Sequence, residues 1–144
     1  MVEQVSVFLE NSTGRLAELT RALGDAGIDM HALMVADTES FGVVRIMCDT
    51  PRAARSLLEG LGFSVTLTPV IAVEVPDRPG GLADVLEALG QADKNVEYAY
   101  CFVKPLGDAA VDVLKVDDAS AEATLLAGGF SVLAAADVYA VDPE

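Results

Sequence analysis

Residues 7–19 read VFLENSTGRLAEL, and residues 73–85 read VEVPDRPGGLADV, so the chain carries nearly the same segment twice. A second pair agrees letter for letter, because GFSV occurs at residues 62–65 and again at residues 129–132. A repeat of roughly 70 residues is too long for a solenoid unit and fits a duplicated small domain. The repetition therefore predicts two copies of one fold, and a site in one copy predicts a site in the other.

The spacing between equivalent residues changes along the chain. It is 66 residues at Leu16, 68 at Ile28 and 67 at Gly62. These values predict that two residues are gained near Asp93 and Lys94, and that one is lost before the next element.

Hydrophobic periodicity predicts the same order of elements in each copy, β-α-β-β-α-β. Residues 4–10 alternate with period two, as in a strand with one dry face, whereas residues 16–26 carry one apolar helical stripe that ends at Gly27. Pro51 opens the second helix and Gly62 ends it. The predicted strands lie at 4–10, 28–37, 41–49, 63–68, 71–75, 96–103, 110–116 and 130–138, and the predicted helices at 16–26, 51–61, 82–92 and around 121–127.

This order predicts an α+β fold made of two ferredoxin-like sandwiches, each an antiparallel sheet with both helices on one face. The predicted domains are residues 1–69 and 70–144, with Thr68 and Pro69 as the only punctuation between them. A lone half of about 70 residues buries a marginal core, so we expect the two domains to pack on one another.

Charge and hydropathy exclude several classes of partner. The chain has 9 basic and 23 acidic residues and a formal net charge of -14, which offers no electrostatic footprint for nucleic acid or an anionic membrane. No basic and apolar leader stands at the amino terminus, and no apolar stretch approaches the roughly 18 residues of a membrane span. We therefore expect a cytoplasmic protein.

The cysteines and the histidine give no sign of a metal or disulfide centre. Cys48 and Cys101 are isolated in apolar strands, far from CxxC spacing, which predicts buried, reduced thiols. His31 is the only histidine and needs carboxylate help to build a metal site, so it is expected to be packed or interfacial. We expect no metal and no cofactor. The aromatic alternation of Tyr98, Tyr100 and Phe102 is typical of packing on a strand.

The turn before the first helix of each copy has the strongest chemical pattern. Residues 11–16 read NSTGRL and residues 77–82 read DRPGGL, so each turn places a polar residue at a strand end and a glycine at a helix entry. Unpaired N–H groups at the positive end of a helix can bind a carboxylate. The same residues also fit an ordinary tight turn in which Ser12 or Thr13 caps the helix.

This pattern, with the strand that begins Gly-Ile-Asp-Met at residues 27–30, resembles the ACT domain, a small regulatory module of amino-acid metabolism. The resemblance covers nearly the whole chain as a tandem pair with no catalytic domain. It implies a free amino acid bound where two ACT units meet, with the two sheets commonly joined into one of eight strands. The residues implied in ligand binding are Asn11, Thr13, Gly14, Arg15, Leu16, Asp29, Asp77, Arg78, Pro79, Gly80, Gly81, Leu82 and Glu97.

The chain departs from the family pattern at several of these positions. Leu9 and Val75 replace a histidine that some members carry before the turn, and the Arg-Pro-Gly turn is intact only at residues 78–80. Carboxylates at Asp29, Asp77 and Glu97 suit an amine, while Arg15 or Arg78 suits an acid group. We expect non-identical pockets at the junction of the two copies, with either one or both of them occupied.

No Ser-His-acid set or phosphate-binding GxxxxGK[ST] occurs, so we expect no catalysis. Two hypotheses remain. One is a regulatory sensor that binds an amino acid and signals to a metabolic enzyme or regulator. The other is a ligand-free assembly module that acts by pairing with an enzyme or with itself as a homodimer.

Overall fold

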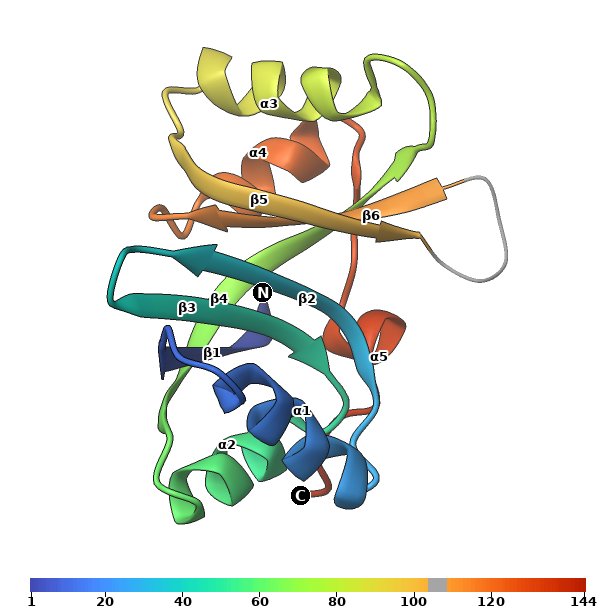
Figure 1. The fold of residues 1–144 in the computed structure, drawn as a ribbon. Coiled ribbons are helices and arrows are strands. Elements are labelled where there is room, and N and C mark those ends of the chain that lie inside the picture. The colour runs from blue at the N-terminus through green and yellow to red at the C-terminus, as the bar shows by residue number, and fades with distance from the viewer. Residues whose placement is uncertain (104–108) are drawn as a thin grey trace. The chain divides into compact units, whose positions relative to one another are not determined.

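A computed structural model describes residues 1–103 and 109–144, and Figure 1 shows its elements. It has two compact units, one formed by residues 3–68 with 139–144 and one by residues 1–2 with 69–138. The helices and strands are β1 (Val2–Glu10), α1 (Arg15–Asp25), β2 (Met30–Asp37), β3 (Phe41–Cys48), α2 (Pro51–Gly60), β4 (Ser64–Pro76), α3 (Gly81–Gln91), β5 (Val96–Val103), β6 (Ala109–Val116), α4 (Ala121–Ala127), β7 (Ser131–Val132) and α5 (Ala135–Val138).

The unit of residues 3–68 follows the predicted ferredoxin-like order. Its strands pair as β2-β3-β1-β4, with β3 antiparallel to both β1 and β2. Val5 and Val7 on β1 pack against Leu19 and Leu23 of α1 and Leu58 of α2 in one buried core. The odd-numbered side chains of β1 therefore face the helices, as the period-two pattern predicts.

The unit of residues 69–138 repeats this arrangement, but its last strand, β7, has only two residues. Its strands pair as β4-β6-β5, and β7 pairs with β4 at Val73 and Glu74. The core joins Ile71 and Val73 to Val85 and Leu89 of α3 and to Leu125 of α4. Strand 130–138 was predicted too long, because the chain leaves the sheet after Val132 and forms the helix α5 instead.

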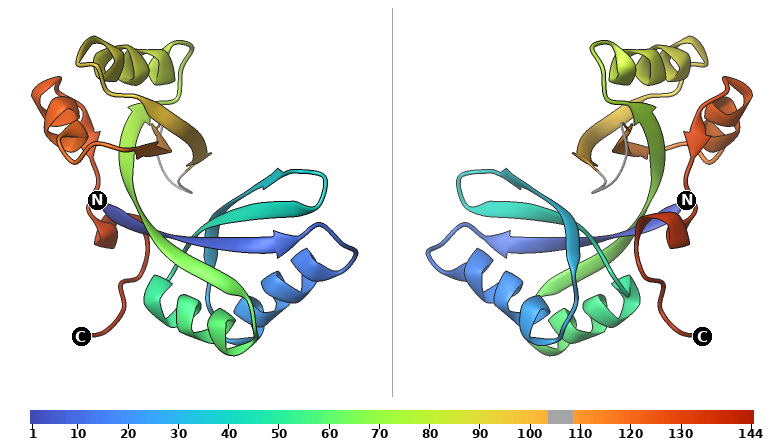
Figure 2. Two further views of the ribbon diagram at one scale, coloured as in Figure 1. Left: turned by 90° about the vertical axis from the view of Figure 1, so that its left-hand side faces the viewer. Right: turned by 90° about the vertical axis from the view of Figure 1, so that its right-hand side faces the viewer.

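The strand β4 is one continuous element where two strands were predicted. It runs from Ser64 to Pro76, contributes to both units and is drawn in light green in Figure 2. Pro69 lies before Ile71, the first residue paired with β6 in the register, so its missing N–H removes no bond of that ladder. Over the residues that the structure describes, the sheet consequently has seven strands rather than the expected eight.

Strand pairing corrects the predicted alignment of the two copies. Ala32 pairs with Met47 beside one bulge, and Tyr98 pairs with Lys115 beside the other, so β2 and β5 differ by 66 residues and β3 and β6 by 68. The two additional residues thus enter between β5 and β6, not near Asp93. With the offset of 66 residues, the residue of the second copy that is equivalent to Asp29 is Asn95, and the one equivalent to His31 is Glu97.

The two cysteines differ in exposure. Cys48 is buried, and burial raises the pKa of its thiol to about 12, with the nearby Asp49 carboxylate acting in the same direction. Cys101 is exposed, so the prediction that both thiols are buried is wrong for this residue. Along the described part of the chain, no helix is long and apolar enough to cross a membrane.

We expect a thiol reagent such as dithionitrobenzoate to label one cysteine per native chain. The thiolate is the reactive form, and a buried thiol with a raised pKa supplies almost none of it near neutral pH. Cys101→Ser should abolish the fast reaction, whereas Cys48→Ser should leave it intact. Fast labelling of both thiols without denaturant would contradict this assignment.

Candidate functional site

The predicted turns share one backbone conformation. Gly14 precedes α1 with φ 87°, and Gly80 precedes α3 with φ 85°, a region that glycine adopts without steric cost. Neither helix start is capped by a side-chain hydrogen bond, so the expected cap from Ser12 or Thr13 is not formed. The first N–H of each helix donates back into its own turn, at 3.3 Å in α1 and at 3.1 Å in α3, so the second and third N–H groups are the ones that remain available to an acceptor.

The predicted residues of the first turn lie together at the start of α1. Asn11 and Thr13 are exposed, and the Asn11 backbone N–H donates to Ser40 O at 3.1 Å. Leu16 is also exposed, on the outer side of the helix. Arg15 is the one member of this group with a close aromatic contact, because its guanidinium carbon lies 4.7 Å from the ring centre of Phe63.

The second turn has the same course but binds its own arginine. Arg78 donates through Nη2 to Asp84 Oδ2 at 2.9 Å and through Nη1 to Pro79 O at 3.2 Å. Asp77, Pro79 and Leu82 are exposed. Gly81 is buried beneath the turn. The arginine of this copy is therefore already occupied by its own turn.

Asp29 and Glu97 lie away from the turn of their own copy. Asp29 follows the end of α1, whereas the turn precedes the start of α1. Because a helix of 11 residues is roughly 16 Å long, the helix separates Asp29 from the turn. Glu97 follows α3 in the same way, and its Oε2 lies 3.4 Å from Lys115 Nζ. Within either unit, therefore, the predicted polar residues do not converge on one pocket.

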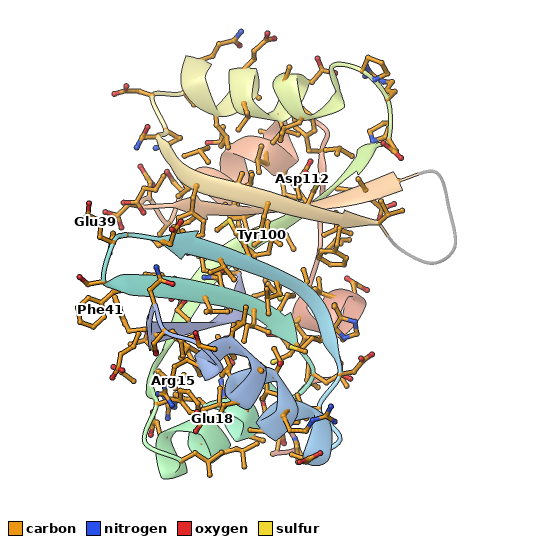
Figure 3. All side chains as sticks on the ribbon, in the orientation of Figure 1. Arg15, Glu18, Glu39, Phe41, Tyr100 and Asp112 are labelled. Carbon is orange, nitrogen blue, oxygen red and sulfur yellow. The ribbon has the colours of Figure 1, made fainter. Side chains whose placement is uncertain are left out.

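A pocket of about 550 Å³ opens beside Arg15 in the unit of residues 3–68. Figure 3 labels two residues of its lining, Arg15 at the start of α1 and Phe41 at the start of β3. Its full lining is Phe8, Glu10, Arg15, Phe41, Gly62, Phe63 and Ser64. Pockets of 300–1,000 Å³ with apolar walls and few polar groups are typical of small-molecule sites.

Strand register explains how these side chains meet. Glu10 on β1 pairs with Phe41 on β3, and directly opposed residues point to the same face of a sheet. Phe8 lies two residues before Glu10 and shares that face, where it is 54% exposed. The phenylalanines were not predicted as site residues from the sequence. Phe8 stands at a position of β1 where the alternation predicts a polar residue, and this exception could have indicated a functional surface on that face.

Arg15 brings an incompletely paired cation to the pocket. Its Nη1 donates to Glu18 Oε2 at 2.8 Å, while its buried Nε has no hydrogen-bond partner among the described residues. A guanidinium presents a planar fork of donors that matches a carboxylate. The pocket thus combines one cation, the Glu10 anion and aromatic walls.

Comparison with known proteins identifies the family. The family profile described as "ACT domain pair" matches residues 1–141. The chain belongs to this family. Protein BT0572 from Bacteroides thetaiotaomicron has a solved structure that is 33% identical, with a TM-score of 0.90 and a match over 96% of this chain and 95% of that chain.

Other solved structures share the fold of this ACT domain pair. The ligand-free regulatory subunit of aspartate kinase from Thermus thermophilus is 19% identical, with a TM-score of 0.67 over 88% of this chain and 90% of that chain. The corresponding subunit from Thermus flavus is also 19% identical, with a TM-score of 0.60 over 87% and 88%. A comparison with curated proteins finds no match.

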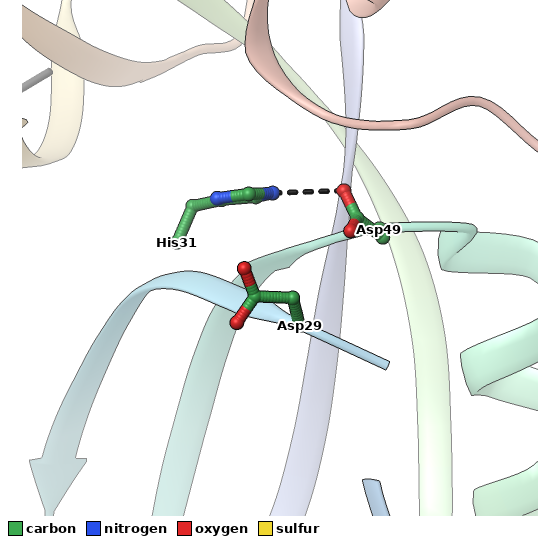
Figure 4. Close-up of side chains that lie close together, drawn as sticks. All are labelled: Asp29, His31 and Asp49. Atoms are coloured by element: carbon green, nitrogen blue, oxygen red, sulfur yellow. Dashed lines mark hydrogen bonds and ion pairs between the residues drawn. The ribbon is translucent and has the colours of Figure 1, made fainter. Parts of the chain in front are cut away.

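The ACT domain pair also contains a cluster of three polar side chains that sequence spacing did not reveal. Asp29, His31 and Asp49 offer ligand atoms that all lie within 4.8 Å of one another (Figure 4). His31 is half-buried, and its Nε2 lies 2.8 Å from Asp49 Oδ1. This contact, with the backbone N–H of Ala140 also donating to Asp49 Oδ1, holds the pKa of the Asp49 carboxyl below its usual range.

Proposed function

We propose that this ACT domain pair is a non-catalytic regulatory protein that binds a free amino acid and passes its bound state to a metabolic partner. The observation that supports this most is the pocket beside Arg15. The family resemblance places the ligand of an ACT protein at a contact between two units. The pocket adds an apolar wall for the ligand within the unit of residues 3–68.

The lining of the pocket matches the parts of an apolar or aromatic amino acid. Arg15 suits the ligand carboxylate through charge-assisted hydrogen bonds, and the uncapped start of α1 adds donors from the backbone. Glu10 suits the ammonium group. Phe8, Phe41 and Phe63 provide a hydrophobic surface for the side chain.

Regulation follows from the position of Arg15 at the first residue of α1. In the structure Arg15 is paired with Glu18, one turn further along the same helix. A bound carboxylate competes with Glu18 for the guanidinium and so links the pocket to the exposed side of α1. A ligand shifts a conformational equilibrium only by its differential affinity for the two states, so the partner must distinguish them.

A thermal-shift screen of the full chain against the common amino acids tests the proposal. A ligand present at 100 times its dissociation constant adds about 2.7 kcal/mol to the free energy of unfolding. We expect stabilisation by one class of apolar or aromatic amino acids. Arg15→Gln should weaken the affinity by about 10-fold or more, because a hydrogen bond to a charged group contributes about 1.5–3 kcal/mol.

Arg21→Gln is the matched control. Arg21 also lies on α1 and pairs with an acid of its own helix, Asp25, but does not line the pocket. Its substitution should leave amino-acid binding unchanged. The proposal fails if no amino acid stabilises the protein, or if Arg15→Gln and Arg21→Gln bind equally well.

The alternative function is a ligand-free assembly module, and the exposed phenylalanines favour it. Phe8 is 54% and Phe41 58% exposed on adjacent strands, an arrangement also suited to a protein contact. Under this alternative, Phe41→Asp abolishes binding to a protein partner while no amino acid binds. Self-association measured by light scattering, lost in Phe41→Asp, would then identify a homodimer.

A further inference from the structure

We propose that Asp29, His31 and Asp49 form a binding site for a divalent transition-metal ion. The proposal is independent of amino-acid binding, because the three residues lie outside the lining of the pocket. They belong to the single unit formed by residues 3–68 and 139–144.

The donor atoms are close enough to share one ion. His31 Nε2 and Asp49 Oδ1 are 2.8 Å apart, and all three donors lie within 4.8 Å of one another. Metal bonds of about 2.0–2.2 Å place neighbouring ligands of a tetrahedral ion roughly 3.4 Å apart. Small side-chain rotations therefore bring the set to bonding distance, and Figure 4 shows both carboxylates beside the imidazole.

The backbone holds these side chains in place. The Asp49 N–H donates to Asp29 O at 3.0 Å, so the two carboxylate-bearing residues are joined directly. His31 lies at the irregularity of β2, between Met30 and Ala32, and a bulge of this kind re-aims a side chain. The Ala140 N–H, 2.7 Å from Asp49 Oδ1, orients the second carboxylate in the manner of an outer-shell partner.

The second copy of the fold provides an independent comparison, because a cation is built into the same place. Glu97 corresponds to His31 and Asp117 to Asp49 by strand pairing. Between them lies Lys115, whose Nζ is 3.4 Å from Glu97 Oε2 and 3.7 Å from Asp117 Oδ1. In the first copy the position of Lys115 is occupied by Met47, which is fully buried and uncharged. The first copy thus keeps ligand-type side chains and lacks the internal ammonium.

Along residues 1–103 and 109–144, no other internal cation compensates for this difference. Among the residues that the structure describes, no lysine or arginine pairs with Asp29 or Asp49. Other described cations pair elsewhere, as Arg52 does with Glu3 and Lys94 with Asp118. The chain carries a formal charge of -14, which favours the approach of a cation.

The donor set decides which ion fits. An imidazole nitrogen suits Zn²⁺, Ni²⁺, Cu²⁺ or Fe²⁺, whereas Mg²⁺ and Ca²⁺ prefer sites made only of oxygen ligands. One histidine with two carboxylates also leaves coordination positions for water. We therefore expect a preference for Zn²⁺, Ni²⁺ and Co²⁺ over Mg²⁺.

The test uses the full chain without a histidine tag, freed of metal by a chelator and titrated with Zn²⁺ in a calorimeter. We expect one site per chain, with Mg²⁺ binding at least 10-fold more weakly. Asp29→Asn is the decisive variant, because the Asp29 carboxylate has no protein partner among the described residues to lose. Loss of an outer-shell partner typically weakens metal binding by about 10–100-fold, so Asp29→Asn and His31→Gln, which each remove a direct ligand, should weaken Zn²⁺ binding by at least that much.

Glu97→Gln is the matched control, because it changes the corresponding position of the second copy and should leave Zn²⁺ binding intact. Co²⁺ provides a second measurement, since its visible absorption reports the coordination geometry. The Ala140 amide resonance should also shift on Zn²⁺ addition, because its acceptor becomes a metal ligand. A stoichiometry of zero, or equal Zn²⁺ affinity in wild type, Asp29→Asn and His31→Gln, would overturn the proposal.

Discussion

Removal of residues 139–144 is expected to lower the free energy of unfolding of the unit that contains residues 3–68 by about 3 kcal/mol. This short segment contacts that unit and is part of it, although residues 69–138 separate the two in sequence. The loss combines a helix cap, backbone hydrogen bonds and a buried aromatic ring.

Asp142 provides the cap that α2 lacks locally. Thr50 stands at the cap position with φ 42° and makes no side-chain cap hydrogen bond. Asp142 instead accepts from the backbone N–H groups of Arg52 at 3.0 Å and Ala53 at 2.9 Å. Loss of such a cap costs about 0.5–2 kcal/mol, and the carboxylate also complements the positive end of the helix.

The remaining contacts hold the entry to α2 in its unusual conformation. Thr50 N–H donates to Ala140 O at 2.7 Å, which constrains a residue whose left-handed backbone is unfavourable for a β-branched side chain. Tyr139 is 6% exposed, and its hydroxyl accepts the Glu3 N–H at 3.0 Å. Burial of an aromatic side chain adds about 1.5–3 kcal/mol, part of which is recovered if the unit relaxes.

Urea unfolding and amide hydrogen exchange measure the effect. We expect faster exchange in α2 and at Thr50 in the truncated chain, and Asp142→Ala alone should cost about 1 kcal/mol. Deletion of Pro143 and Glu144 is the control, because none of the contacts described above involves them. Equal stability of the two truncated chains would show that the segment does not support the unit.

The duplicated pattern predicted the fold because local signals agree with the final structure. Alternation on β1, the leucine stripe of α1 and the glycine before α1 and α3 all depend on neighbours in sequence. The merging of two strands into β4 was not predictable in this way. Pro69 reads as a break, and it is tolerated because pairing with β6 starts beyond it.

The candidate sites were less predictable because they depend on contacts distant in sequence. Asp49 reaches His31 through the β2–β3 pairing, and the Ala140 amide comes from 91 residues away. The spacing between equivalent residues also predicted the two additional residues before β5, whereas strand pairing puts them after it. The predicted alignment of β2 with β5 was therefore wrong by two residues, and it did not match His31 with Glu97. Cross-strand pairing shows this correspondence.

Gly81→Ala is expected to destabilise the protein by about 1–3 kcal/mol, the range for overpacking. A Cβ built at Gly81 would lie 2.5 Å from Pro76 O, and this atom is backbone that cannot rotate away. The turn of residues 77–80 must then widen, which also displaces the start of α3. Arg15 occupies the equivalent position in the first copy, so the close approach is a property of the second turn alone.

Gly90→Ala should instead raise the free energy of unfolding. Gly90 lies in the same helix, and a Cβ there meets nothing within 4 Å. In an open helical position alanine is more stable than glycine by about 0.5–1 kcal/mol, because the unfolded chain loses less freedom. Chemical denaturation of both variants compares the midpoints against wild type. If both substitutions stabilise the protein, then Pro76 can move aside and the second turn is not rigid. Opposite changes in the free energy of unfolding for these two glycines of one helix would therefore show that the turn resists displacement.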